Sequence, residues 1–396
     1  MNKKKESKVV PNVRFKGFTD VWKQRKVRDV TDRYDNLRIP VAANLRVSGT
    51  TPYYGANGIQ DYVDGYTHDG EFILVAEDGA NDLKNYPVRC VQGRIWVNNH
   101  AHVLQGKYDS ADNKFLACAI SQADIESLLV GGGRAKLNAE NLMDMNLLLP
   151  NKAEQMRIGK YLAQLDHLIT LHQQKITLLT KLKKAMLEKM FPKKGTVIPE
   201  FRFNGFANAW EQRKLGDVAE IVRGASPRPI SDPKWFDDNS DVGWLRISDV
   251  TNQNGRIHYL EQHISKLGQE KTRVITEPHL LLSIAATVGK PLINYVKTGV
   301  HDGFLIFLNP SFDLEYMYQW LEMFRPEWNK YGQPGSQVNL NSDLVKNQII
   351  ILPSEDEQKN ISSFLKKFDH LITLHQCKID KIKNMKKAML DQMFIQ

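Results

Sequence analysis

Two stretches of the chain show the same helical pattern of apolar and polar positions. Apolar residues step by threes and fours along residues 151–191 and again along residues 354–394. This spacing predicts two long α-helices, each carrying a coiled-coil seam over about five heptads. At a rise of about 1.5 Å per residue, each helix should be roughly 60 Å long. Pro150 and Pro353 stand just before the helices, where proline does not interrupt the helical hydrogen bonds.

The two predicted helices are copies of one another. The octet Asp166–Gln173 (DHLITLHQ) returns unchanged as Asp369–Gln376, 203 positions later. A literal repeat of this kind indicates a duplicated architecture.

Polar residues interrupt both seams at matching positions, His172 with His375 and Lys183 with Lys386. One interpretation is that these side chains extend to water from the edge of the seam. The other starts from the two histidines, which lie near the middle of their helices. Antiparallel pairing about a pseudo-twofold axis would bring His172 and His375 together, where a polar pair fixes the register.

The beginnings of the two helices carry capping residues. Asn151 with Glu154, and Ser354 with Glu357, have the spacing of a capping box. Glu357-Gln358-Lys359 also has the Glu-x-Lys form of a nuclease site, but its position at a helix start favours capping.

A second repeat lies upstream of each helix. Residues 13–30 match residues 201–218 at an offset of 188, and we call these two segments the opening motifs. The chain is therefore two copies of one plan. It is predicted to comprise a disordered basic tail at 1–12, a first domain at 13–150, a long helix at 151–191, a linker at 192–200, a second domain at 201–353 and a second long helix at 354–396.

The two domains between the repeats contain short runs of strand-forming residues punctuated by Gly, Asn and Asp. This pattern predicts mixed α/β domains and an α+β fold class. The expected strands include Phe72–Glu77, Arg94–Asn98, Ala101–Leu104, Trp244–Ile247, Leu280–Ala285, Leu292–Tyr295 and Phe304–Leu308. The expected helices are near Ser110–Ile120, Ser121–Val130 and Leu314–Phe324.

Composition narrows the class of protein. Among the 396 residues no apolar run reaches 18, so neither a membrane span nor a signal peptide is expected. Cys90, Cys118 and Cys377 are far apart and odd in number, which favours a reducing cytoplasm over a disulfide framework.

The net charge of +9 suggests a nucleic-acid partner, but the charge is unevenly distributed. Residues 13–150 and residues 201–353 each contain 16 basic and 17 acidic side chains, so the excess lies on the tail and the helices. If the domains recognise DNA, they do so through base edges or shape, and another component supplies much of the phosphate contact.

Motifs of catalysis are missing from the sequence. Gly106-Lys107, Gly159-Lys160 and Gly289-Lys290 are followed by Tyr, Tyr and Pro, so none is a P-loop. Asn99-His100-Ala101-His102 offers two imidazoles without a third ligand at metal spacing, and a strand or loop contact is favoured over a metal. The chain is therefore predicted to have no catalytic residues, no cofactor site and no metal site.

These features together resemble the specificity (S) subunit of type I restriction-modification systems, from about residue 13 to residue 394. The most specific markers are Trp210–Val218 (WEQRKLGDV), with its first copy at Trp22, and the Pro-x-x-x-Glu-Gln helix starts at Pro150 and Pro353. Glu77–Asn81 and Trp96–Val103 also look like one recurrent type of target recognition domain.

The resemblance implies a fold and a function. Two pseudo-repeated mixed α/β target recognition domains would be separated by an antiparallel coiled coil of the two long helices. Each domain would recognise one half of a bipartite, asymmetric site in double-stranded DNA, and the coiled coil would set the unread gap. Two modification (M) subunits carrying S-adenosylmethionine would methylate adenine N6, and restriction (R) subunits would add ATP- and Mg-dependent translocation and cleavage.

Candidate base contacts are the polar or basic residues of Gly-punctuated loops, because Arg binds guanine bidentately and Asn or Gln binds adenine. The loop chemistry near the end of each domain differs, which is typical of related modules with different specificities, although such residues can also be merely solvated. The candidates are Arg46, Tyr53, Tyr54, Asn57, Asn99, His100, Arg134 and Lys136 in the first domain, and Arg223, Arg228, Arg246, Lys290, His301, Gln337 and Asn339 in the second.

Two other functions remain open at this point. The chain could be an architectural protein whose two heads bind protein or RNA, or an enzyme of the restriction class acting by itself. The missing motifs argue against the enzyme, and a co-purifying methyltransferase would exclude the architectural protein.

Overall fold

The computed structural model describes residues 10–131, 135–193, 195–284, 287–328, 330 and 340–395. The chain divides into two compact units, a first unit of residues 1–174 with 376–396 and a second unit of residues 175–375. Each unit therefore contains one domain together with a part of both long helices. This division differs from the predicted domain boundaries, which separate the helices from the domains.

The first unit is built on a six-stranded sheet. Its strand order is β2 (Thr31–Arg33), β7 (Ala101–Gly106), β5 (His68–Ala76), β6 (Val88–Val97), β3 (Ser48–Gly55) and β4 (Gly58–Val63). All neighbours are antiparallel except β3 and β6. Because side chains alternate along a strand, Ile73 and Val75 of β5 enter one core while Phe72 and Leu74 enter another.

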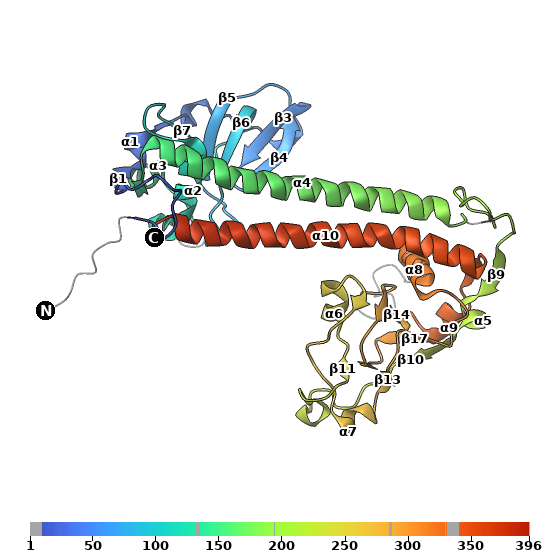
Figure 1. The fold of residues 1–396 in the computed structure, drawn as a ribbon. Coiled ribbons are helices and arrows are strands. Elements are labelled where there is room, and N and C mark those ends of the chain that lie inside the picture. The colour runs from blue at the N-terminus through green and yellow to red at the C-terminus, as the bar shows by residue number, and fades with distance from the viewer. Residues whose placement is uncertain are drawn as a thin grey trace. The chain divides into compact units, whose positions relative to one another are not determined.

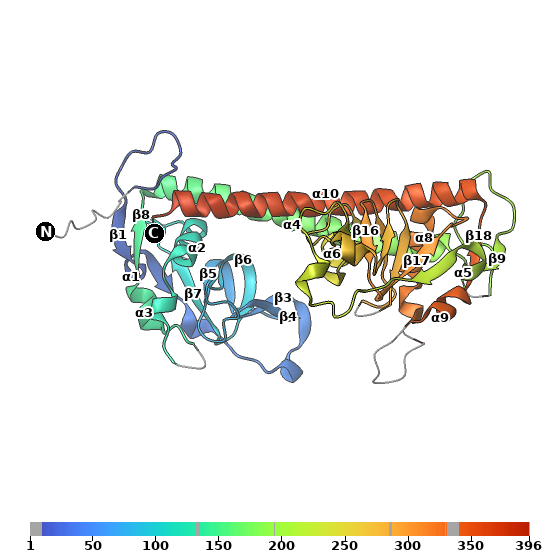
Figure 2. The same ribbon diagram turned by 90° about the horizontal axis from the view of Figure 1, so that it is seen from below.

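Smaller elements join this sheet to the long helices. Strand β1 (Lys23–Lys26) of the opening motif pairs with β8 (Asn146–Leu149), the strand that leads into the first long helix. Helix α2 (Asn113–Gln122) packs on β5 and β6 and lies toward the long helices (Figure 2). The remaining elements are α1 (Val27–Val30), α3 (Ala139–Asp144) and short 3-10 turns at Asp35–Leu37, Ala43–Leu45 and Glu126–Leu128.

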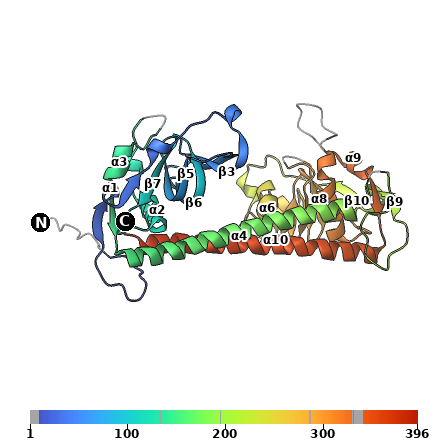
Figure 3. The ribbon, with the colours of Figure 1, turned by 90° about the horizontal axis from the view of Figure 1, so that it is seen from above.

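The second unit has a different sheet arrangement. A five-stranded sheet runs β10 (Glu220–Arg223), β17 (Phe304–Leu308), β14 (Leu280–Ser283), β15 (Pro291–Asn294) and β12 (Arg256–Ile257). A three-stranded sheet runs β11 (Gly243–Trp244), β16 (Thr298–Val300) and β13 (Arg273–Ile275). Helix α8 (Leu314–Trp328), which is labelled in Figure 3, packs on β14 and β15.

The opening motif of the second unit repeats the first arrangement. Strand β9 (Glu211–Lys214) pairs with β18 (Ile349–Leu352), again just before a long helix. The remaining elements are α5 (Leu215–Val218), α6 (Ile247–Asn252), α7 (Lys266–Gln269), α9 (Ser342–Lys346) and a 3-10 turn at Pro233–Trp235.

The mixed α/β character of both domains is confirmed, but two of the predicted elements are wrong. The helix expected near Ser121–Val130 is only a 3-10 turn, because the segment has no continuous apolar face. The strand expected at Trp244–Ile247 ends at Trp244, and helix α6 begins at Ile247, where the Asp249 side chain accepts a hydrogen bond from the Arg246 amide.

The two long helices, α4 (Lys152–Met190) and α10 (Glu355–Met393), have 39 residues each and pair antiparallel (Figure 1). In the first unit Lys386 Nζ lies 2.6 Å from Asp166 Oδ1, and in the second unit Lys183 Nζ lies 2.5 Å from Asp369 Oδ1. The two lysines thus bind carboxylates of the opposing helix, and neither lysine side chain is fully buried. His172 belongs to the first unit and His375 to the second, so their role in the register stays a prediction.

The start of each long helix is joined to an opening motif by a buried ion pair. Asn151 Oδ1 caps helix α4 by accepting from the Glu154 amide at 3.0 Å. The Glu154 side chain does not complete the predicted capping box, because both its oxygens accept from Arg14, at 2.8 and 2.6 Å. Glu357 likewise binds Arg202, at 2.7 and 2.8 Å, so the capping role predicted for it is wrong.

The glutamine that follows each buried glutamate ties the same joint to the domain. Gln155 donates to the carbonyls of Ser110 and Pro150 and accepts from the Asp112 amide. Gln358 donates to the Pro353 carbonyl and accepts from the Asp313 amide. The repeated Pro-x-x-x-Glu-Gln motif is therefore a structural joint between helix and domain in both units.

Each unit has a core that contains its opening motif, the start of one long helix and the end of the other. In the first unit Trp22 shares a core with Ile158 of α4 and packs against the ring of Phe394, just beyond α10. In the second unit Trp210 shares a core with Phe191 and Ile361. The repeated Met-Phe pairs at the helix ends are thus core residues. In the part of the chain that the structure describes, no helix is both long and apolar enough to cross a membrane.

Candidate nucleic-acid interface

Two of the candidate base contacts in the first domain are used inside the domain. Tyr53 is only 1% exposed, and its hydroxyl lies between the amide and the carbonyl of Val41. The Arg46 guanidinium stacks on the Tyr53 ring at 4.1 Å and also bonds Asp61 and the Val41 carbonyl. Burial removes Tyr53 from the residues that a base can reach, and Arg46 is held by this packing.

Asn57 and Tyr54 lie at the turn between β3 and β4. The Asn57 side chain donates to the Gly79 carbonyl and accepts from the Asn81 amide, both at 2.9 Å. Tyr54 is half-buried, and burial raises the pKa of its hydroxyl. This turn is therefore fixed to the loop at residues 78–81, one of the segments that carry the family resemblance.

The other such segment, around residues 98–102, meets the same loop. His100 Nδ1 binds the Asp78 carboxylate, while Asn99 is exposed beside it. Lys136 Nζ binds Glu77 Oε1 at 2.9 Å, so Lys136 is tied to the segment at residues 77–81. Arg134, Gln337 and Asn339 lie outside the described residues, and their base contacts stay predictions.

A buried charge network lies beneath these loops. Asp35, Glu77 and His102 bring potential ligand atoms within 4.8 Å of one another. Arg38 also binds Glu77, at 2.7 Å, and the two His102 nitrogens bond Asp35 and the Leu137 carbonyl. Burial acts to raise the pKa of Glu77, but hydrogen bonds from Lys136 and Arg38 outweigh it and the pKa is lowered. These partners make the cluster an internal network that supports the loops.

In the second domain, three candidates come together around one residue, Asp302. Arg228 Nη2 donates to Asp302 Oδ2 at 2.6 Å, and Arg223 Nε donates to the Asp302 carbonyl at 2.6 Å. His301 stands next to them and accepts from the Gly303 amide through Nδ1. Burial lowers the pKa of the His301 imidazole, which favours its neutral form.

The other two described candidates of this domain lie in different surroundings. Arg246 binds both Asp249 and Glu261, and the hydrogen bond to Asp249, followed by that to Glu261, raises its pKa. Lys290 lines a cavity of about 770 Å³ together with residues of the long helices, and burial lowers the pKa of its ammonium group. Among the described residues, no hydrogen bond or ion pair links Arg246 or Lys290 to Asp302.

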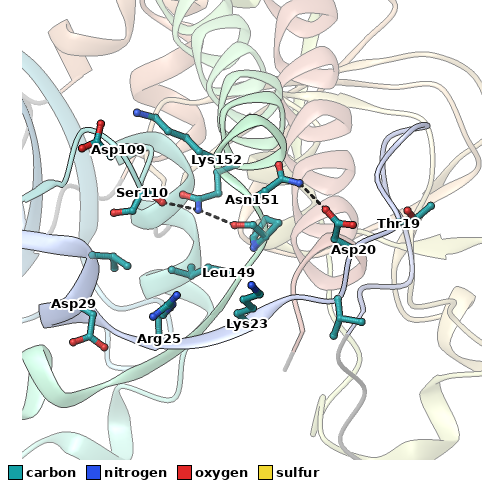
Figure 4. A pocket seen from close by; sticks show the side chains of 14 residues that line it. Thr19, Asp20, Lys23, Arg25, Asp29, Asp109, Ser110, Leu149, Asn151 and Lys152 are labelled. Carbon is teal, nitrogen blue, oxygen red and sulfur yellow. Dashed lines mark hydrogen bonds between the residues drawn. The ribbon is translucent and has the colours of Figure 1, made fainter.

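A groove of about 830 Å³ separates strand β1 from the start of α4 in the first unit. Figure 4 shows Lys23 and Arg25 of β1 on one side and Asn151 and Lys152 on the other. Asn151 Nδ2 donates to Asp20 Oδ2 at 3.2 Å across this region. The groove combines three separate segments of the chain, so the sequence alone did not indicate it.

The sequence profile of one protein family, described as the type I restriction modification DNA specificity domain, matches residues 19–181 and again residues 208–384. The two matches cover most of the chain and fall on its two repeated halves. The chain belongs to this family. The role of DNA specificity subunit, which the resemblance implied, is confirmed, and the architectural alternative is not favoured.

Two named relatives are similar over most of their length. A putative type I restriction enzyme specificity subunit of Haemophilus influenzae is 29% identical over 354 residues, which cover 88% of each chain. The type I restriction enzyme MjaVIII specificity subunit of Methanocaldococcus jannaschii is 24% identical over 298 residues, covering 70% of this chain and 68% of the relative.

Solved structures of low identity share the fold of this specificity subunit. The crystal structure of the S subunit from M. genitalium superposes with a TM-score of 0.70 at 13% identity, over 97% of this chain and 99% of that one. A chain solved in a study of the assembly and conformational transition of a type I restriction-modification system gives 0.54 at 16% identity, over 94% and 97%.

Sequence reasoning missed the acidic residues that organise the candidate loops of the specificity subunit. Asp302 directly follows the candidate His301, yet no pattern marks it as the partner of Arg228, which lies 74 positions away. Asp35 bonds His102 from 67 positions away. A search for acidic residues next to candidate basic ones would have found Asp302 but not Asp35.

Proposed function

We propose that this specificity subunit recognises a bipartite, asymmetric DNA site, one half with each domain, while the paired helices set the gap between the halves. The observation that carries the proposal is the presence of two separate domains on one repeated frame. Each unit has its own core and its own joint of opening motif, buried glutamate and long helix.

The difference between the two domains supports an asymmetric site. The first domain has a six-stranded sheet, whereas the second has a five-stranded and a three-stranded sheet. Their described candidate side chains also differ, with Asn57 and His100 in the first and Arg228 in the second. Recognition of two unlike half-sites requires two different domain surfaces, and here they are carried on joints of the same design.

Exchanging residues 31–150 for the corresponding block of a relative is expected to change one half of the methylated sequence and leave the other half and the gap unchanged. The physical reason is that the second unit keeps its own core when the first domain is replaced. Methylation sequencing of a host that carries the exchanged chain with its methyltransferase partner measures this directly. A change in both halves would contradict independent recognition.

The long helices offer matching surfaces for two copies of one partner. Within the repeated octet, Leu168 and Leu171 are each 42% exposed, and their second copies Leu371 and Leu374 are each 40% exposed. Exposed leucines that recur unchanged in both copies suit an apolar contact made twice. We assign this contact to two modification subunits, with restriction subunits joining the complex they form.

The chemistry belongs to these partners in our proposal. The modification subunits would bring S-adenosylmethionine and transfer its methyl group to adenine N6, and the restriction subunits would use ATP and Mg for translocation and cleavage. The present chain would supply sequence recognition and spacing alone.

The chain by itself is expected to bind DNA weakly and with little specificity, and addition of the modification subunits should create tight specific binding. The two domains carry no net positive charge with which to hold the phosphate backbone. Fluorescence anisotropy with a duplex containing the site measures both states, with a scrambled duplex as control. Nanomolar specific binding by the chain alone would contradict this division of labour.

A further inference from the structure

Loop 224–229 of the second domain is fastened to the turn at residues 301–303. The Gly224 amide donates to the Phe304 carbonyl at 2.9 Å, and the Ala225 amide donates to the Val300 carbonyl at 3.0 Å. A Cβ atom at Gly224 would lie 2.2 Å from the His301 carbonyl oxygen, so only glycine allows this approach. Two backbone hydrogen bonds and this close approach therefore hold the start of the loop against the turn.

Asp302 occupies the centre of this arrangement. Its Oδ1 accepts from Ser226 Oγ at 2.7 Å, and its Oδ2 accepts from Arg228 Nη2 at 2.6 Å. Burial acts to raise the pKa of Asp302, but the Ser226 hydrogen bond and the Arg228 charge outweigh it, so the pKa is lowered and the carboxylate is ionised at neutral pH.

Arg228 is held at one N–H by Asp302 and still has most of its donors available. Its side chain is 71% exposed, and Asp302 takes one of the five N–H groups of the guanidinium. Arg46 differs because it is 14% exposed and stacked on Tyr53. Arg246 differs because both Asp249 and Glu261 bind it. Arg223, the fourth of the described candidate arginines, is also exposed, but its Nε donates to the main-chain carbonyl of Asp302 rather than to the carboxylate.

A guanidinium that is held at one N–H by a carboxylate matches the needs of guanine recognition. Guanine presents two acceptors, O6 and N7, in the major groove, and arginine binds both through adjacent N–H groups. A fixed side chain loses less conformational freedom on binding than a mobile one. The pairing also selects against adenine, which presents a donor where guanine presents O6.

We propose that Arg228 reads a guanine in the half-site recognised by the second domain, with Asp302 as its positioning residue. This inference rests on the proposed function, since it names the base contact of one recognition domain. Loss of one bidentate contact corresponds to roughly tenfold to hundredfold loss of discrimination at one base pair.

The test uses the complete complex with its modification subunits and sequences the methylated sites of a host. Arg228→Ala is expected to relax one position, occupied by guanine on one strand, within the second half-site. The first half-site should stay unchanged. Lys297→Ala is the matched control, because Lys297 forms a surface pair with Asp241 in the same domain and should leave the whole motif unchanged.

The positioning role of Asp302 is tested by measuring the preference for guanine separately from the overall affinity for DNA. Asp302→Asn in the purified complex is expected to reduce the preference for guanine at the same position, while the affinity for duplexes with other bases there stays the same. Asp302→Glu keeps a carboxylate and should restore part of the preference. Equal weakening on every duplex would assign Asp302 a structural role and overturn its positioning role.

The remaining outcomes are also decisive. An unchanged motif for Arg228→Ala, or relaxation at several positions, overturns the base contact while leaving the two-part site intact. If the Arg228→Ala complex methylates nothing, its binding is measured by competition between duplexes that differ at single base pairs. A loss of affinity confined to the duplex with guanine at the tested position supports the contact, and an equal loss of affinity for all duplexes overturns it. A wild-type complex with no two-part motif would instead overturn the proposed function.

Discussion

Replacing Glu357 by Gln is expected to lower the free energy of unfolding by about 3 kcal/mol, because it leaves a half-buried guanidinium without its counter-ion. Glu357 is 1% exposed, and its two oxygens accept from Arg202 Nε and Nη2. Trp210 Nε1 also donates to it at 3.1 Å. The substitution therefore weakens three hydrogen bonds that join the second opening motif to helix α10.

Urea denaturation of the full chain, followed by circular dichroism, measures this loss. Glu355→Gln is the matched control on the same helical turn. Glu355 is exposed, and its ion-pair partner among the described residues is Lys359 one turn away, so its replacement should leave the transition unchanged. Equal midpoints for the two variants would show that the ion pair of Glu357 with Arg202 contributes little to the stability of this joint.

The roles of Glu154 and Glu357 mark the limit of what local sequence patterns can predict. Both glutamates stand at capping-box spacing, and that pattern describes contacts within one helical turn. Their actual partners are 140 and 155 positions away, at Arg14 and Arg202. The repeat of both arginines and both glutamates was visible in the sequence, but nothing in either pattern indicated that one binds the other.

The long helices were predictable because their seam is a periodic pattern that sequence shows directly. Helices α4 and α10 begin and end within one residue of the segments where that pattern runs. The candidate base contacts were less predictable, because loop residues of the same type take opposite roles. Tyr53 and Arg46 pack together inside the first domain, whereas Arg228 extends from a fixed loop in the second. Tertiary neighbours, which a single sequence does not reveal, decide between the two.

Replacing Asp369 by Asn is expected to cost about 2 kcal/mol of unfolding free energy, whereas the same change at Asp166 should cost less than about 1 kcal/mol. The two residues open identical octets, so sequence alone predicts equal effects. Asp369 is 20% exposed and binds Arg256 of β12 as well as Lys183. Asp166 is 53% exposed and binds Lys386.

The difference comes from how each domain rests on the helix pair. Gln319 of α8 donates to Asp369 at 2.7 Å, so this carboxylate holds both a helix and a strand of the second domain. Asp166 instead lines a cavity of about 910 Å³ between the helices and the first domain. Parallel urea titrations of Asp369→Asn and Asp166→Asn compare the two sites. A larger loss for Asp166→Asn would mean that the lysine pairs, rather than the contacts of Asp369 with the second domain, dominate the stability of these joints.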